Sequence, residues 1–511
     1  MNLRNRLFLS AVSGTLLACA YPPFNWELLG WVCFVPFLWA LKEASGFQTY
    51  LAGLVLGICG IFIGFSWVAV WVEKALGTTT LPGVLFLIGF SFSFAQLFGV
   101  MAVLLRWLKL RTGFDDLFLF PLALVAVFTL FPLLFPFRLG DSQWRIPLVL
   151  QPIDMTGISG LDFTMALSNS LIFRLLSGGG SPGKRWGSVA GGLIILVWLG
   201  TGWGKWSAWE REIDNWPDKK IGIVQPNRPP ALSKPRPEPG FSRLAPLEMI
   251  LSKPLAAQGA DLLIWPEGHF FGYTFWSRVR EAFTNTIRNW QTPLVFYDAT
   301  RRAVDGSQRA FNTAIFLDAD GQKIEHYDKI KLVPFSEYLP VLNHLPLFGW
   351  ILGEYLDTLT PGTETKVVAL SGMKLVPKIC YEPLFPGFVA QTIGKDGAGK
   401  VIIVQSQDGW FGKTGQPFQH MAVTVMRAVE NRVPLVHVIQ NGPSGVIAPS
   451  GRIQFLSEAF SRGSWLVEMP FHPERGGSFY SRHPMLFDTC IRIACLLLIG
   501  YGLYRTHKRT R

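Results

Sequence analysis

Apolar residues follow two different patterns along this chain. Before about residue 205, and again after about residue 484, they form runs that approach the roughly 20 residues a helix needs to cross a membrane. Eight runs are predicted as spans, and the sixth is the least regular because Ser168, Asn169 and Ser170 interrupt it. The predicted spans cover residues 7–21, 28–41, 50–72, 81–105, 117–137, 163–176, 189–203 and 485–504.

The charges of the short loops predict the orientation of these spans. Lys and Arg in short loops stay on the cytoplasmic side of a membrane. They occur before the first span and after the second, fourth, sixth and eighth, for example at Arg4, Lys42 and Arg106. Both termini are therefore predicted to be cytoplasmic, and the segment between the last two spans faces the other side. In a bacterium that side is the periplasm.

Between the last two spans the pattern changes to short apolar strands that alternate with helical segments. This alternation predicts an α/β domain of roughly 255 residues, long enough for its own core. The predicted strands cover residues 221–225, 262–265, 293–297, 314–317, 401–404 and 435–438, and the predicted helices cover residues 245–258, 276–290 and 419–431.

Composition narrows the classes of function. Hydrophobic residues make up 49% of the 511 residues, which argues against a single soluble domain. The net charge is +12, but the chain has no basic stripe interleaved with aromatic residues, so nucleic-acid binding is not expected. Membrane orientation and nearby anionic lipid explain the excess of Lys and Arg better.

Cys380 differs from the other five cysteines because it alone lies outside the apolar, membrane-like runs. Exported domains usually pair their cysteines, so one lone thiol favours a reactive role over a structural one. Cys19 allows another interpretation, since residues 16–19 resemble a lipoprotein signal. A further apolar span follows almost at once, which favours a retained helix.

Three polar residues follow strand-like runs, where α/β domains tend to assemble their sites. These residues are Glu267, Lys329 and Cys380. Singly, each has an ordinary explanation as a solvated strand end, a surface lysine or a packed thiol. Together they form a set for acyl transfer, because a thiol needs a base to remove its proton and a partly buried carboxylate can serve. The lysine and the amide after the cysteine can then stabilise the oxyanion.

Neither a metal nor a cofactor is expected. His326, His344, His420 and His437 lack the spacing of metal ligands, and no Cys and His pair resembles a zinc site. The glycines at 178–180 lie in a short turn between spans and do not open a helix as a phosphate-binding loop does.

The motifs around the three residues resemble those of the nitrilase superfamily. The chain reads Trp-Pro-Glu at 265–267, Tyr-Asp-Lys at 327–329, Leu-Val-Pro-Phe-Ser-Glu at 332–337 and Ile-Cys-Tyr-Glu at 379–382. With eight spans around such a domain, the whole chain is similar to the bacterial apolipoprotein N-acyltransferase family.

This resemblance implies a four-layer αββα domain inserted between the last two helices of an eight-helix transmembrane bundle. The implied parts are a membrane bundle at 1–215, an exported catalytic domain at 216–478, and a last helix with a basic cytoplasmic tail at 479–511. The implied location is the bacterial inner membrane.

The resemblance also implies a ping-pong reaction. Cys380 takes an acyl chain from a glycerophospholipid, preferentially phosphatidylethanolamine, and passes it to the α-amino group of the diacylglyceryl-cysteine of an apolipoprotein. Glu267 is the implied general base and Lys329 the implied oxyanion stabiliser. Supporting or substrate-binding positions are implied for Glu337, Tyr381 and Glu382.

Two aromatic segments are expected to meet lipid. Residues 338–352 are apolar but too broken to span a bilayer, and they are expected to form an interfacial arm or lid. In a soluble enzyme the same segment would be core. The run 269–276 is expected to line the same route to the thiol.

Two other classes of function remain open. One is a membrane-tethered amidase that uses the same three residues on a soluble substrate, although such a hydrolase would need only one anchor. The other is a transporter or sensor with a catalytically silent domain, against which the intact Glu267, Lys329 and Cys380 argue.

Overall fold

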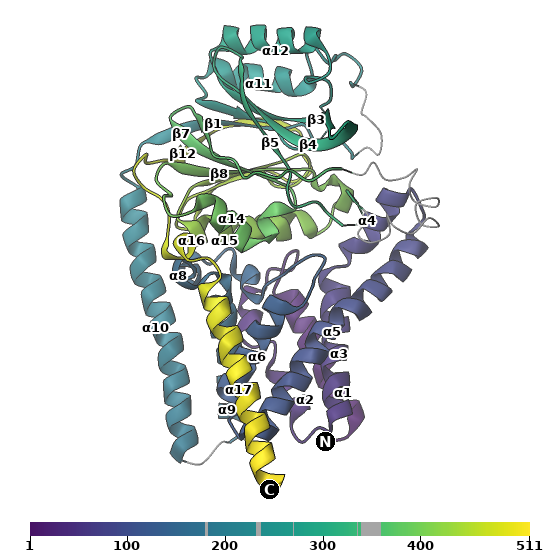
Figure 1. The fold of residues 1–511 in the computed structure, drawn as a ribbon, viewed down its shortest axis with the longest axis vertical. Helices are drawn as coiled ribbons and strands as arrows, with labels where there is room; N and C mark the ends of the chain where they lie inside the picture. The colour runs from purple at the N-terminus through teal and green to yellow at the C-terminus, as the bar shows by residue number, and fades with distance from the viewer. Residues whose placement is uncertain (179–181, 231–236, 269, 335, 339–358, 511) are drawn as a thin grey trace. The chain divides into compact units, whose positions relative to one another are not determined.

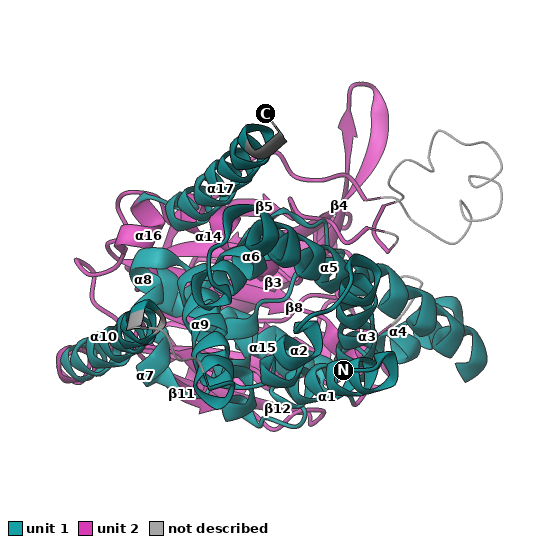
Figure 2. Cartoon of the chain, turned by 90° about the horizontal axis from the view of Figure 1, so that it is seen from below, with its two compact units in different colours: residues 1–209, 414–430, 483–511 teal, residues 210–413, 431–482 magenta. Residues whose placement is uncertain are grey.

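A computed structural model describes residues 1–178, 182–230, 237–268, 270–334, 336–338 and 359–510. The chain divides into two compact units, which Figure 2 shows in different colours. Unit 1 consists of residues 1–209, 414–430 and 483–511, and unit 2 consists of residues 210–413 and 431–482.

Unit 1 is helical (Figure 1). Among its described residues, four stretches are long and apolar enough to cross a membrane: residues 46–64, 80–112, 185–213 and 486–508, the third of which continues into unit 2. Its main helices are α1 (Leu3–Cys19), α2 (Val35–Leu41), α3 (Gly46–Gly64), α4 (Trp67–Leu76), α5 (Thr80–Thr112), α6 (Asp116–Leu130), α9 (Ile158–Leu176), α10 (Pro182–Ile213), α15 (Gln416–Asn431) and α17 (Leu486–Thr510).

Each predicted span contains a helix, but three predicted spans differ from the structure. The second is split into the 3-10 helix Glu27–Trp31 and helix α2, which begins only at Val35. The third is broken between α3 and α4, at Phe65 and Ser66. The fifth is helical only as far as Leu130. Phe131 has an extended backbone there because it precedes Pro132, and a proline disfavours the helical conformation of the residue before it.

Helix α15 lies in unit 1, although the strands before and after it in the chain lie in unit 2. Its Gln419 amide donates to the carbonyl oxygens of Pro22 and Gly64, at 2.9 Å each, and accepts from Trp67 Nε1 at 3.0 Å. Its Glu430 carboxylate accepts from the backbone N–H of Ile158 at 2.9 Å. These backbone groups lie at helix ends or breaks, where intrahelical partners are missing. Side chains of α15 therefore satisfy polar groups that the membrane helices leave open.

Unit 2 contains two six-stranded sheets, with the orders β12-β1-β2-β3-β4-β5 and β11-β10-β9-β8-β7-β6. The strands are β1 (Asp218–Gln225), β2 (Leu262–Ile264), β3 (Leu294–Val304), β4 (Ser307–Leu317), β5 (Lys323–Asp328), β6 (Val368–Leu370), β7 (Met373–Ile379), β8 (Lys400–Ser406), β9 (Leu435–Ile439), β10 (Gly445–Ile447), β11 (Ile453–Leu456) and β12 (Gly463–Pro470). The strands β1, β2 and β3 run parallel, as do β7, β8 and β9, and the remaining neighbours are antiparallel. All six predicted strands are confirmed, and so is the α/β class.

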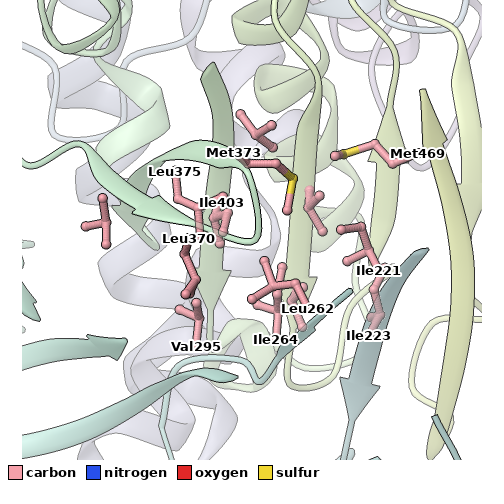
Figure 3. Packing of buried hydrophobic residues seen from close by; sticks show 14 of the residues in the cluster. Ile221, Ile223, Leu262, Ile264, Val295, Leu370, Met373, Leu375, Ile403 and Met469 are labelled. Atoms are coloured by element: carbon pink, nitrogen blue, oxygen red, sulfur yellow. The ribbon is translucent and has the colours of Figure 1, made fainter. Parts of the chain in front are cut away.

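The two sheets share one apolar cluster, to which both contribute side chains (Figure 3). Alternation along β2 shows how the faces divide. Leu262 and Ile264 enter this shared cluster, while Leu263 packs on the other side with Val279 and Phe283 of helix α12 (Ser277–Trp290). Because successive side chains of a strand point to opposite faces, β2 is apolar throughout and both of its faces are covered. The further helices of unit 2 include α11 (Leu247–Ala257) and α14 (Pro386–Ile393).

Candidate active site

The three candidate residues lie just beyond the ends of three strands, in both sheets. Glu267 follows β2 and Lys329 follows β5, in the first sheet, while Cys380 follows β7 in the second. Strand ends place side chains at the edge of the packed core, where they are held firmly but still reach a substrate.

Glu267 is buried, with 7% of its surface exposed. Its Oε1 accepts from Asn312 Nδ2 at 2.5 Å, and its Oε2 accepts from the backbone N–H of Gln407 at 3.1 Å. Burial raises the pKa of the Glu267 carboxyl, although the nearby Lys329 ammonium opposes that rise. A carboxylate with a raised pKa binds a proton more readily, which suits it to act as a base.

Lys329 is almost fully buried between two carboxylates. Its Nζ lies 2.7 Å from Glu337 Oε1 and 3.5 Å from Glu267 Oε1. Burial alone disfavours the ammonium, but attraction to Glu267 and Glu337 outweighs it and raises the pKa of Lys329. The backbone of Lys329 is fixed as well, because its N–H donates to Asn312 O at 2.9 Å and its carbonyl accepts from Gly362 N–H at 2.8 Å. Lys329 therefore presents a permanent positive charge at a fixed place.

Cys380 has a left-handed backbone conformation, with φ of 49°. A residue other than glycine rarely adopts this conformation, and such strain is found most often at functional sites. Its N–H donates to the carbonyl of Gln405 in β8 at 2.8 Å, which ties the turn to the sheet. Burial raises the pKa of the Cys380 thiol, the charge of Glu267 adds to the rise, and Lys329 opposes it. The thiol is therefore protonated at rest and needs a base before it can act as a nucleophile.

Glu382 joins the segment that carries Lys329 to the segment that carries Cys380. Its Oε1 accepts from Tyr327 Oη at 2.7 Å and from the N–H groups of Ile330 and Lys331 at 2.8 and 3.2 Å. Its Oε2 accepts from the N–H of Ile379, directly before the thiol, at 2.8 Å. We refer to these four hydrogen bonds to one buried carboxylate as the Glu382 clamp.

The two other predicted supporting residues lie beside this group. Glu337 contacts Lys329 through Oε1. Its Oε2 accepts from the N–H of Val333 at 2.8 Å, a hydrogen bond that joins the two ends of the turn from Val333 to Glu337. The ring of Tyr381 is buried and packs edge-on against Phe385, with ring centroids 5.0 Å apart. The structure thus brings Glu267, Lys329 and Glu337 into direct contact and ties the turn of Cys380 to them through Glu382.

Sequence reasoning did not single out Asn312, although its amide donates to Glu267 and reaches Glu337 Oε1 at 3.5 Å. The available signal was a polar side chain within the apolar strand β4, where it is 5% exposed.

The aromatic run after Glu267 divides between core and surface. Phe270 and Tyr273 are buried in the cluster beneath α12, because their rings pack against Phe283 and Phe296. Phe275 and Trp276 are exposed at 39% and 42%, and for them the expected role beside lipid stays a prediction. The predicted arm falls mostly on residues 339–358, which lie outside the described residues.

No group of three or more His, Cys, Asp or Glu side chains is arranged to hold a metal ion within the described part of the chain. All six cysteines are free of disulfide bonds. The titratable side chains described at this site are a thiol, carboxylates and an ammonium group.

Comparison with known proteins gives two adjacent matches along the chain. The carbon-nitrogen hydrolase family model matches residues 220–471, and the apolipoprotein N-acyltransferase N-terminal domain model matches residues 13–171. The apolipoprotein N-acyltransferase of Geobacter metallireducens is 28% identical over 502 residues, which covers 95% of this chain and 92% of the relative. That of Brucella melitensis is 27% identical and covers 100% of this chain and 97% of the relative. A solved amidase of the nitrilase superfamily from Nesterenkonia is 20% identical with a TM-score of 0.37, and the match covers 49% of this chain and 90% of the amidase.

Proposed function

Because the chain belongs to the apolipoprotein N-acyltransferase family, whose members are nitrilase-superfamily enzymes, we propose that it completes the acylation of bacterial lipoproteins. An acyl chain moves from a glycerophospholipid, preferentially phosphatidylethanolamine, to Cys380. It then moves to the α-amino group of a diacylglyceryl-cysteine at the N-terminus of an apolipoprotein. The observation that carries this proposal is the buried contact of Glu267, Lys329 and Glu337, joined through the Glu382 clamp to a strained thiol.

In the first half-reaction, Glu267 removes the proton of Cys380 and the thiolate attacks the ester carbonyl of the phospholipid. The raised pKa of Glu267 makes it a capable acceptor of that proton. The oxyanion is stabilised by the Lys329 ammonium and by the N–H of Tyr381. The carbon–oxygen ester bond then breaks, Glu267 returns the proton to the leaving alkoxide, and lysophospholipid departs from the thioester.

In the second half-reaction the neutral α-amino group of the acceptor attacks the thioester carbonyl. The same two donors stabilise the oxyanion, the carbon–sulfur bond breaks, and the thiolate and the proton of the amine regenerate the resting thiol. Two carboxylates beside one lysine are useful here, because the ammonium keeps its charge through both half-reactions.

A membrane part supports the proposal that both substrates are lipids. The proposed arrangement has eight spans, cytoplasmic termini and a periplasmic four-layer αββα domain within residues 216–478. Four stretches long and apolar enough to span support a multi-pass protein. Phospholipid and acceptor are both anchored in the bilayer, so an enzyme held there meets them at the surface where their reacting groups lie.

The experiment that tests this proposal offers purified enzyme two kinds of substrate. One sample receives phosphatidylethanolamine vesicles and a diacylated lipopeptide, and the other receives a small aliphatic amide. We expect a triacylated lipopeptide in the first, no ammonia in the second, and neither product with Cys380→Ala. Hydrolysis of the amide without acylation of the lipopeptide would contradict the proposal and favour a tethered amidase.

A further inference from the structure

A second buried lysine lies on the strand that leads to the thiol. Lys378 is in β7, two residues before Cys380, and its side chain is fully buried. It faces helix α14, where its Nζ donates to Thr392 Oγ1 at 3.0 Å. The Nζ also lies 4.2 Å from the centre of the Phe388 ring and 5.5 Å from that of Tyr327. No role described so far uses this residue.

Burying an ammonium here is costly, because its direct partners are few. Lys378 forms no ion pair within 4.0 Å among the described residues, and one hydroxyl and two aromatic faces replace the water it has lost. A buried lysine without a close carboxylate is rarely kept for stability alone. Its charge therefore needs an explanation in the function of the neighbouring groups.

The titratable and charged groups near Lys378 come from three parts of the fold. Glu382, beyond the end of β7, attracts it; Tyr327 of β5 lies beneath it; and Lys331, after β5, reaches the same Phe388 ring from 5.5 Å. Burial lowers the pKa of Lys378 to about 8, with Glu382 opposing the fall. The lowered pKa brings the loss of the Lys378 proton closer to neutral pH.

Glu382 is the carboxylate of the clamp, and like Lys378 it is fully buried. Tyr327 donates a hydrogen bond to it at 2.7 Å, and the Lys378 ammonium lies 5.5 Å from the centre of the Tyr327 ring. An ammonium group is attracted to the face of an aromatic ring, and this attraction is stronger away from water. Loss of the charge of Lys378 removes that attraction, loosens Tyr327, and so weakens the hold of Glu382 on the N–H groups of Ile379 and Ile330, which flank the thiol and the catalytic lysine.

We propose that Lys378 is a positioning residue for acyl transfer: its buried ammonium packs on the ring of Tyr327, holds that side chain against Glu382, and so keeps the Glu382 clamp closed around the turns of Cys380 and Lys329. The proposal rests on the acyl-transfer function proposed above. It predicts that the clamp, and with it the donor half-reaction, weakens when Lys378 loses its proton.

The clamp itself is tested by hydrogen exchange, which does not depend on activity. Peptides that cover residues 327–332 and 376–382 are followed by mass spectrometry at pH 7 and pH 9, with correction for the intrinsic exchange rate. In the wild-type enzyme we expect protection at pH 7 and a loss of about tenfold at pH 9, the factor expected when one charge-assisted interaction is lost. Lys378→Met should be unprotected at both pH values, and Lys378→Arg protected at both.

The catalytic consequence is tested by the rate of thioester formation on Cys380 from phospholipid alone. Omitting the acceptor removes the titration of its amine from the pH profile. We expect the wild-type rate to fall above pH 8, Lys378→Arg to keep its rate to higher pH, and Lys378→Met to be about tenfold slower without that fall. Lys374→Met is the matched control, since Lys374 lies on the same strand but its side chain is 46% exposed and pairs with Asp396. It should match the wild type in both experiments.

Two results would overturn the positioning role. One is unchanged protection of both peptides in Lys378→Met, and the other is lost protection without any change in the thioester rate. If the wild-type enzyme forms no thioester at any pH, the acyl-transfer function fails, and the hydrogen-exchange result still decides whether Lys378 closes the clamp.

Discussion

The carboxyl of Glu267 is buried beside the Lys329 ammonium. Burial raises the pKa of this carboxyl, and the attraction of its carboxylate to Lys329 lowers it. Burial dominates, so its pKa is raised. A carboxylate with a raised pKa is a stronger base than a solvated carboxylate. Lys329 remains charged because Glu337 lies nearer to it, at 2.7 Å against 3.5 Å for Glu267. One carboxylate thus holds the lysine while the other remains available to the thiol.

Glu267→Gln should abolish most of the donor half-reaction while the site stays assembled. The glutamine keeps an oxygen to accept from Asn312 or Gln407 but cannot take a proton. We expect thioester formation to slow by about 10²–10⁴-fold, the usual contribution of a general base. Rapid-quench mass spectrometry of the enzyme with phospholipid measures this rate. A variant within a factor of a few of wild type would remove Glu267 from the mechanism.

The acid side of the pH profile should report the same carboxyl. Its folded pKa is raised, so Glu267 gains a proton at a higher pH than a free glutamate does, and the base is lost as pH falls through that raised value. We expect thioester formation to decline on acidification well before a solvated glutamate would protonate. In Glu267→Gln the residual rate should show no such decline, which distinguishes titration of this group from acid unfolding.

Lys378 should affect stability and activity in opposite directions. Its pKa is lowered to about 8, so folding disfavours the ammonium and the unfolded chain binds more protons between about pH 8 and 10.5. The contribution of Lys378 to the free energy of unfolding therefore rises by about 3 kcal/mol as the pH increases through that window. The free energy of unfolding of Lys378→Met minus that of wild type should shrink over the same range. A difference that is independent of pH would show that Lys378 is not buried as a cation.

At the scale of elements, the side chains of α15 form hydrogen bonds with polar groups at the ends and breaks of the membrane helices. Gln419 alone makes three hydrogen bonds to Pro22, Gly64 and Trp67. We expect Gln419→Ala to destabilise unit 1 by about 2 kcal/mol or more, because it removes three hydrogen bonds from partly buried groups. Thermal unfolding in lipid nanodiscs measures the loss. The exposed Lys413→Ala, just before α15, is the control and should melt with the wild type.

Element by element, the sequence was most informative where side chains are buried. The six predicted strands are apolar because both faces of their sheets are covered, as in β2. Strands β11 and β12 escaped prediction because most of their residues are only partly buried or exposed, and β11 is four residues long. The break between α3 and α4 was equally hidden, since it depends on Gln419, more than 350 residues away in the chain.

The candidate site was predictable only in part for the same reason. Glu267, Lys329 and Cys380 each follow a strand, which sequence alone can reveal. Asn312 and the backbone donors of the Glu382 clamp reach the site through pairing of strands and turns that are distant in sequence. The positive φ of Cys380 is likewise a property of the folded turn.

At the scale of the whole molecule, one chain carries both a candidate thiol site and several stretches suited to a membrane. Four apolar stretches suited to a bilayer and the two family matches, at residues 13–171 and 220–471, belong to one chain. A covalent intermediate suits substrates that arrive one after the other by diffusion in the membrane. The lysolipid can leave before the lipoprotein arrives only if the acyl chain is stored on the protein in the meantime.

The most direct test of that claim is the mass of the Cys380 peptide after the purified enzyme is mixed with phosphatidylethanolamine alone. We expect an adduct of one acyl chain on Cys380 that is labile to hydroxylamine, is released on addition of diacylated lipopeptide, and is missing in Glu267→Gln at short times. An enzyme that acylates the lipopeptide while Cys380 never carries an acyl chain would contradict it.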